Sequence, residues 1–137
     1  MAFPVFESNV GPVHAVANFG SEELEQKYIP RVCAGDLVMA VSMSEPSAGS
    51  ALTDLKTRAK VEGDTVVING NKRWCSGAGH AGAYVVYCRM SDDPGAKGIG
   101  AVVVDKEAKG LTFGKQEQLM GFRGVPSADM FFDNVEV

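Results

Sequence analysis

The sequence predicts a mainly β domain, an antiparallel barrel or sandwich-like fold, preceded by one or two short helices. Two observations predict this fold: short apolar or alternating runs recur from residue 37 onward, and turns rich in glycine, proline, asparagine and aspartate separate them. Short strands at regular spacing are typical of a barrel or sandwich, whereas a parallel sheet needs helices between its strands. The length of 137 residues suits a single domain with one core.

The segment before residue 37 has the pattern of two short helices. Residues 12–19 suit the end of a helix, because the glycine that follows breaks the pattern. Ser21 is a suitable N-cap for the second helix, since two glutamates occupy its first turn, where negative side chains favour the helix dipole. We expect this helix to cover residues 22–29, with Pro30 limiting it and Gly35 supplying a left-handed stop.

From residue 37 onward we expect strands that alternate with turns. The strands are residues 37–44, 57–62, 65–69, 72–76, 84–90, 99–105, 111–115 and 129–137. Gly63-Asp64 and Gly70-Asn71 are expected turns, and the first of them closes a hairpin. Residues 91–98 (SDDPGAKG) have the composition of an exposed hairpin end.

Composition excludes several classes of function. With 13 lysines and arginines against 17 aspartates and glutamates, the net charge is −4, and no stretch gathers the basic face that nucleic acid requires. No apolar run reaches the roughly 18 residues of a membrane span, and residues 1–10 lack the basic start and apolar stretch of a signal peptide. Cys33, Cys75 and Cys88 have no CxxC spacing, which predicts neither a disulfide framework nor a zinc site. We therefore expect a soluble, intracellular protein that binds neither nucleic acid nor metal.

Common catalytic signatures are missing from the sequence or stand in the wrong context. Gly77, Gly79 and Gly82 have GxGxxG spacing, but a dinucleotide-binding fingerprint must open a helix, and the strand-like AYVVYC follows here. His14 and His80 lie far apart, without the spacing of metal ligands. The sequence offers no nucleophile with an evident base, so hydrolase chemistry is not indicated.

Two polar stretches at strand ends are the strongest functional signal in the residues themselves. They are residues 39–50 (MAVSMSEPSAGS) and residues 72–79 (KRWCSGAG). Each takes a strand into a turn of small residues, which leaves hydroxyl groups and backbone N–H groups at the strand end. We expect the two stretches to lie side by side and to hold an anion or a flat polar ring. The structural alternative is that they are surface turns and that Trp74 is an ordinary core or edge residue.

Four motifs then occur in an order and at distances typical of one family. They are SMSEPSAGS (residues 42–50), INGNKRWCSGAG (68–79), GLTFGKQEQLMGFRG (110–124) and FFDNVEV (131–137). Together they resemble the middle β-domain of the acyl-CoA dehydrogenase family, and residues 20–36 resemble the end of that family's N-terminal helical domain. The resemblance implies that residues 1–36 end the helical domain and that residues 37–137 form the middle β-domain, which faces flavin and acyl-CoA. It also implies that the family's C-terminal helical domain is absent from this sequence.

The resemblance implies that the protein is an oxidoreductase. Such a flavoprotein oxidises the Cα–Cβ bond of an acyl-CoA thioester and passes hydride to N5 of FAD, as in fatty acid metabolism. The implied partners are an electron-transfer flavoprotein or another acceptor and further copies of the chain, usually in a tetramer. The implied location is the cytoplasm, or the mitochondrial matrix in a eukaryote. Because the family's catalytic carboxylate belongs to the C-terminal domain, we expect no catalytic residue here and no activity of the segment alone.

The resemblance assigns cofactor-binding positions along the first polar stretch. Val41, Met43 and Ser44 match the strand beside the flavin ring, and the Ser44 hydroxyl fits a contact to the pyrimidine edge. Gly49 and Ser50 match a turn that meets the FAD phosphates, and Ser50 also lies near the acyl-CoA substrate. The family commonly has tyrosine or phenylalanine at the position of Val41, so the wall beside the flavin is smaller here.

The second polar stretch carries the remaining assigned positions, Trp74, Cys75 and Ser76. Trp74 matches an aromatic residue beside the ring, and Ser76 matches a hydroxyl directed at N5. These roles agree with the chemistry of a flavin, which gains electron density at N5 and at the N1/C2=O edge on reduction. A fixed hydroxyl donor stabilises that density better than mobile water.

One alternative from a different class stays open, a non-enzymatic β-barrel module that keeps the fold for binding or assembly. The joint occurrence of Ser44, Ser50, Trp74 and Ser76 favours the flavin-binding segment, because a purely structural barrel does not need that set. Both alternatives predict the same fold, so the fold alone does not separate them.

Overall fold

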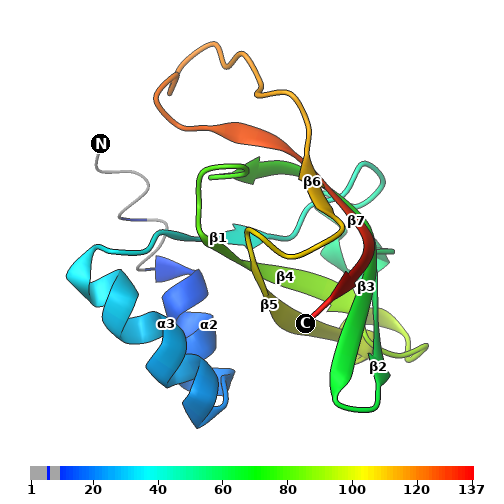
Figure 1. Ribbon diagram of the computed structural model, residues 1–137. Coiled ribbons are helices and arrows are strands. Elements are labelled where there is room, and N and C mark those ends of the chain that lie inside the picture. The colour runs from blue at the N-terminus through cyan, green and yellow to red at the C-terminus, as the bar shows by residue number, and fades with distance from the viewer. Residues whose placement is uncertain (1–5, 7–9) are drawn as a thin grey trace.

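In the part of the chain that the structure describes, the helices α2 (Pro12–Phe19) and α3 (Glu22–Ala34) stand beside a curled seven-stranded sheet, as Figure 1 shows for the computed structural model. The structure describes residue 6 and residues 10–137. The expectation of no signal peptide, and the start of the expected helical segment, fall on residues 1–5 and 7–9 and so lie outside the described residues. Among the residues described, no helix is long and apolar enough to cross a membrane.

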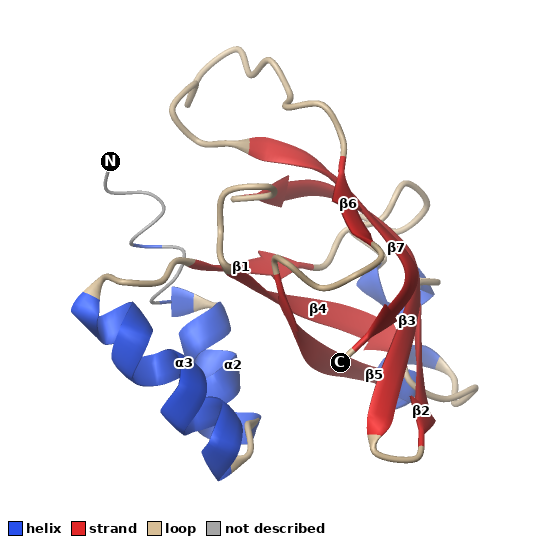
Figure 2. Cartoon of the chain, in the orientation of Figure 1, coloured by secondary structure: helices blue, strands red, loops and turns tan. Residues whose placement is uncertain are grey.

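The strands confirm the prediction of a mainly β domain behind short helices (Figure 2). They are β1 Met39–Ser42, β2 Arg58–Glu62, β3 Thr65–Ser76, β4 Ala83–Arg89, β5 Ile99–Asp105, β6 Leu111–Phe113 and β7 Ser127–Glu136. Two short 3-10 turns, Leu52–Asp54 and Gly95–Gly98, lie in connections between strands, the second within the expected hairpin end. The connection from β6 to β7 projects from one end of the sheet, seen in orange at the top of Figure 1.

The sheet is mixed, although the sequence predicted an antiparallel one. Its order is β1-β4-β2-β3-β7-β6, and β5 pairs with the other edge of β4. The pairs β2–β3, β3–β7, β4–β5 and β6–β7 are antiparallel, whereas β4 is parallel to β1 and also to β2. The parallel pairing arises because the chain leaves β1, builds the β2–β3 hairpin and returns in the starting direction as β4. Parallel neighbours need such a long connection.

Both helices have the predicted end signals. Helix α2 (Pro12–Phe19) ends at Gly20, and helix α3 (Glu22–Ala34) begins after Ser21, whose hydroxyl accepts a hydrogen bond from Leu24 N at 3.3 Å. Gly35 takes a left-handed conformation with φ 83°, which lets its N–H close the end of the helix. The cap and stop signals in the sequence therefore define where α3 begins and ends.

The prediction that Pro30 limits this helix is wrong, because α3 continues through Pro30 to its end at Ala34. A proline inside a helix lacks the N–H that bonds to the preceding turn, a cost of roughly 3 kcal/mol. Tyr28 and Val32, one turn apart on the same face, are both buried. Their packing lies on both sides of Pro30, which is itself exposed, and it offsets the missing hydrogen bond.

The expected turn at Gly70-Asn71 is also wrong, because β3 runs without a break across these residues. Gly70 has φ 143°, and a Cβ atom there would lie only 2.6–2.8 Å from atoms of Thr57. The glycine therefore serves the close approach of two backbone segments within the sheet. Irregular register on both sides of Gly70 bends β3, so that its first half pairs with β2 and its second half continues along β7.

Polar contacts and apolar packing both hold helix α3 against the sheet. Val16 and Tyr28 belong to a core between the helices and the strands β1 and β4. The Tyr28 hydroxyl donates to Asp105 Oδ1 at 2.8 Å, and Lys27 Nζ lies 2.8 Å from Asp105 Oδ2. Partial burial alone would raise the pKa of Asp105, but the two hydrogen bonds outweigh burial and hold that pKa below its usual range.

We expect Asp105→Ala to lower the stability of the protein by about 1 kcal/mol, because the buried Tyr28 hydroxyl loses its acceptor. The Lys27 pair adds little, since both of its side chains are about half exposed. Asp92→Ala is the matched control, because Asp92 pairs with Arg58 at a solvent-exposed site. Thermal unfolding measured by circular dichroism should show a shift for Asp105→Ala only. Equal shifts would contradict a fastening role.

Candidate functional site

The two polar stretches lie side by side, as the sequence predicts, where the end of β1 meets β3. Arg73 N donates a hydrogen bond to Ser44 O at 2.8 Å, and Cys75 Sγ donates to Val41 O at 3.3 Å. These contacts connect β1, at one end of the strand order, to β3 within it, without a regular strand ladder between the two. The site therefore forms at a contact between two strands that are not neighbours in the sheet.

Alternation along β1 divides its side chains between the interior and the site. Ala40 and Ser42 are buried, and the Ser42 hydroxyl contacts Met130 Sδ at 3.4 Å in the core. Val41 and Met43 point to the opposite face and remain partly exposed. Val41 and Met43, which are predicted site residues, thus lie on the open face of the strand. The Ser42 hydroxyl points to the core and does not face the site.

A tight turn follows β1 and presents the small residues. Glu45 N donates to Ala48 O at 2.9 Å and Ala48 N donates to Glu45 O at 3.1 Å, which closes the turn. Gly49 and Ser50 come next and are exposed. No described atom outside its immediate chain neighbours lies within 4 Å of where a Gly49 Cβ would stand, so a ligand can approach this backbone closely.

Trp74 has the most unusual backbone in the site. It lies in a β-bulge, where Arg73 and Trp74 together oppose Asp129 of β7. Its φ is 56°, in the left-handed region that bulky residues rarely adopt, and its side chain is 58% exposed. The Arg73 guanidinium carbon lies 4.8 Å from the centre of the indole ring. A strained and exposed tryptophan is not explained by packing in the core, and such strain is typical of functional sites.

The remaining predicted residues of the second stretch differ in exposure. Cys75 is 3% exposed, and its thiol is turned toward β1, so that only its backbone faces the site. Ser76 is half-buried at the end of β3, opposite Ser127 of β7. It borders an apolar cavity of about 240 Å³ together with His80 and Pro126.

The glycine loop after Ser76 is a tight turn and not the start of a helix. Gly77 and Gly79 have φ of 83° and 77°, and strand β4 follows the loop. The Tyr84 hydroxyl accepts from Gly79 N at 2.9 Å and donates to Gly77 O at 3.3 Å. Burial raises the pKa of Tyr84 far above its usual value, so the phenol keeps its proton and can make both bonds.

Sequence reasoning missed a buried ion pair beneath the site. Lys72 Nζ lies 2.8 Å from Glu45 Oε1, and the two side chains are 0% and 4% exposed. Lys72 also donates to Met43 O at 3.0 Å. Burial alone would raise the pKa of Glu45, but hydrogen bonds from Lys72 and from the backbone at residues 56–57 outweigh it and lower that pKa. The available signal was alternation: Lys72 falls on the same inward face as Ile68.

A larger cavity lies elsewhere, between the helices and the strands β4 and β5. It holds about 1030 Å³ and has a mostly apolar lining that includes Val16, Phe19 and Val102. None of the predicted cofactor residues borders this cavity among the residues that the structure describes. The β1–β3 junction is the candidate site in spite of its smaller cavity, because the strained Trp74, the open turn and the hydroxyl groups lie there.

Comparison with known proteins identifies this architecture. Residues 40–135 match the family model of the acyl-CoA dehydrogenase middle domain. The chain belongs to the acyl-CoA dehydrogenase family, and the residues matched are its middle domain. This confirms the resemblance found in the four sequence motifs.

Three relatives illustrate the family. Cyclohex-1-ene-1-carbonyl-CoA dehydrogenase of Geobacter metallireducens is 43% identical over 120 residues, which cover 86% of this chain and 31% of the relative. 3-Sulfinopropanoyl-CoA desulfinase of Advenella mimigardefordensis is 36% identical over 134 residues, covering 96% of this chain and 33% of the relative. The structure of a glutaryl-CoA dehydrogenase from Mycobacterium smegmatis in complex with FADH2 matches with a TM-score of 0.83 and 26% identity, covering 91% of this chain and 31% of that one. The chain thus spans about a third of the length of the relatives it matches.

We expect Trp74→Gly to leave the stability of the fold within about 1 kcal/mol of wild type, because relief of left-handed strain balances the entropy cost of glycine. Little packing is lost, since the indole is mostly exposed. Ile68→Ala, on the same strand and fully buried, is the control and should cost about 2–5 kcal/mol. Urea unfolding of both variants measures the difference. If both lose the same stability, the indole belongs to the core and not to a site.

Proposed function

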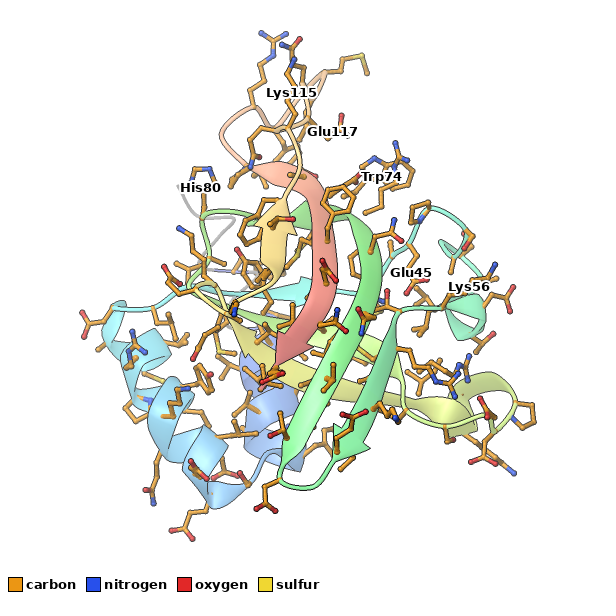
Figure 3. The ribbon with its side chains drawn as sticks, turned by 45° about the vertical axis from the view of Figure 1, so that its right-hand side comes forward. Glu45, Lys56, Trp74, His80, Lys115 and Glu117 are labelled. Carbon is orange, nitrogen blue, oxygen red and sulfur yellow. The ribbon has the colours of Figure 1, made fainter. Side chains whose placement is uncertain are left out.

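We propose that this chain forms one wall of the FAD and acyl-CoA site of an acyl-CoA dehydrogenase-like oxidoreductase. The observation that carries the proposal is Trp74, strained and exposed at the β1–β3 junction, where Ser44 O accepts from Arg73 N and Ser76 ends β3. Figure 3 shows Trp74 pointing outward at the end of the strands. In this proposal, residues 1–36 end the N-terminal helical domain and residues 37–137 form the middle domain.

The residues at the junction fit an acceptor-rich, flat ligand such as FAD. Arg73 Nε is buried and has no hydrogen-bond partner among the described residues, since Asp129 Oδ1 lies 4.0 Å away. An unused buried donor is costly, and a ring carbonyl or phosphate would satisfy it. The open backbone at Gly49 and the hydroxyl groups nearby offer further donors to the same kind of ligand.

Each predicted residue has a distinct role in the proposed site. Val41 and Met43 line the flavin ring, with the backbone of Cys75 beside it. Ser44 and Ser76 direct hydroxyl groups at the pyrimidine edge and at N5. Gly49 and Ser50 bind the diphosphate through backbone and hydroxyl donors, and Ser50 also faces the acyl-CoA, whereas Trp74 covers the edge of the ring.

Bound FAD supplies the two-electron acceptor for oxidation of a Cα–Cβ bond. The proton at Cα is removed by a carboxylate that we place outside these residues, so the segment by itself does not turn over substrate. A thioester of coenzyme A is the proposed substrate class, because all three relatives described above carry an acyl-CoA in their names. We further propose an electron-transfer flavoprotein or another electron acceptor as partner and a homo-oligomer as the working form.

A visible absorption spectrum of the purified full-length protein tests this function directly. The expected result is a bound flavin whose absorption is bleached by an acyl-CoA. Protein that copurifies without flavin and binds none when FAD is supplied would favour the alternative of a non-enzymatic β-barrel module. The desulfinase among the relatives is a reason to follow the products as well as the bleaching, because the name of that relative describes a different reaction.

We expect Ser76→Ala to slow flavin reduction about fivefold to 150-fold, because a donor to N5 worth about 1–3 kcal/mol is lost as electron density grows there. Ser76→Thr keeps the hydroxyl and should be much milder. Ser42→Ala is the matched control, since that hydroxyl faces the core. Stopped-flow bleaching of the FAD-loaded full-length protein measures all three. An unchanged reduction rate in Ser76→Ala would refute the N5 contact.

A further inference from the structure

The buried ion pair between Glu45 and Lys72 is the polar group of this fold that the proposed function leaves unused. Buried lysine and glutamate are rare unless they are paired, and neither side chain here reaches solvent. A pair of this kind adds little stability on balance, because desolvation of two charges offsets their attraction. Its presence under the site therefore needs a reason other than stability.

The pair ties three separate segments of the chain to one another. Lys72 on β3 donates to Glu45 Oε1 at 2.8 Å and to Met43 O at 3.0 Å. Glu45 in turn accepts from Thr57 N at 2.8 Å through Oε1 and from Lys56 N at 2.6 Å through Oε2. Figure 3 shows Glu45 and Lys56 at neighbouring positions. One carboxylate and one ammonium thus hold the end of β1, the start of β2 and the bulged half of β3.

The tied atoms lie next to the residues proposed to meet the cofactor. Met43 supplies the carbonyl that Lys72 holds, and Ser44 follows it directly. Glu45 also closes the turn that presents Ser50. On β3, Lys72 is two residues before Trp74, at the start of the bulge. A shift of the pair would therefore move the end of β1 and its turn relative to the bulged half of β3.

We propose that the Glu45–Lys72 pair positions the flavin-facing ends of β1 and β3, so that Lys72 and Glu45 are positioning residues for FAD. This inference rests on the proposed function. Both side chains are buried, so the pair acts through the backbone of residues 43–50 and not as a direct ligand of FAD. A misplacement of about 1 Å caused by a residue away from the reacting atoms can slow a reaction about 100-fold.

The test compares Lys72→Met with the double variant Lys72→Met/Glu45→Gln in the full-length protein. Lys72→Met leaves a buried carboxylate without its counter-charge and should lower the melting temperature. The double variant removes that unpaired charge and should recover part of the melting temperature, because an amide offers one acceptor oxygen to Lys56 N and Thr57 N where the carboxylate offers two. Both variants release Met43 O, so both should bind FAD more weakly than wild type, by roughly tenfold if about one hydrogen bond to FAD is lost. Recovery of stability without recovery of FAD affinity separates positioning from folding.

Two further measurements support the comparison. Hydrogen exchange of residues 44–57 without FAD should become faster in both variants, which reports the turn independently of activity. Val135→Ala, which opens the core at the far end of β7, should lower the melting temperature but leave FAD affinity and exchange of residues 44–57 as in wild type. This control keeps a general loss of stability apart from a loss of position.

The outcomes distinguish this inference from the function on which it rests. If wild type binds no FAD, the proposed function fails, and the positioning role fails with it. If wild type binds FAD and both variants bind it equally well, the positioning role alone is overturned. It is also overturned if affinity follows the melting temperature, recovering in the double variant or falling in Val135→Ala. If Lys72→Met does not fold, the double variant decides by the same affinity criterion.

Discussion

The contact between β1 and β3, which are not neighbours in the sheet, is the constraint on which the rest of the site depends. The two strands share no regular ladder there, and their contacts include a hydrogen bond from Arg73 N to Ser44 O, the thiol of Cys75 and the ammonium of Lys72. The turn that follows β1 leaves the backbone at Gly49 open, so a ligand can approach it closely.

The same junction explains why local strain is tolerated. The bulge at Arg73 and Trp74 interrupts the pairing of β3 with β7. The half of β3 before the bulge is held by hydrogen-bonded pairing with both β2 and β7. Strain at one residue persists only where the surroundings determine its conformation. The buried pair of Glu45 and Lys72 lies before the bulge along β3. After the bulge, Ser76 is again paired with Ser127 of β7. Rigid structure on both sides thus holds one unfavourable residue in place.

Much of the fold could be predicted because local signals agree with the final structure. The serine cap and the left-handed glycine define α3, and short alternating runs mark the strands. Two predictions were wrong because proline and glycine were expected to end a helix and a strand. Packing on both sides of Pro30 outweighs the loss of one helical hydrogen bond, so α3 continues. Gly70 allows the close approach of Thr57 from another segment, so β3 continues as well. The parallel pairing of β1 and β4 has no local signature at all. For the site, the motifs indicated the exposed residues. Alternation with Ile68 placed Lys72 on the inward face, but its pairing with Glu45 depends on tertiary contacts that the sequence pattern does not show.

The order of the strands along the chain also determines when the site can exist during synthesis. The half of β3 that carries Trp74 and Ser76 pairs with β7, which is synthesised after the β2–β3 hairpin. The hairpin joins neighbours in sequence and can form early, whereas strands that are far apart in the sequence pair more slowly. During synthesis the hairpin can therefore exist before the pairing that surrounds the bulge at Trp74.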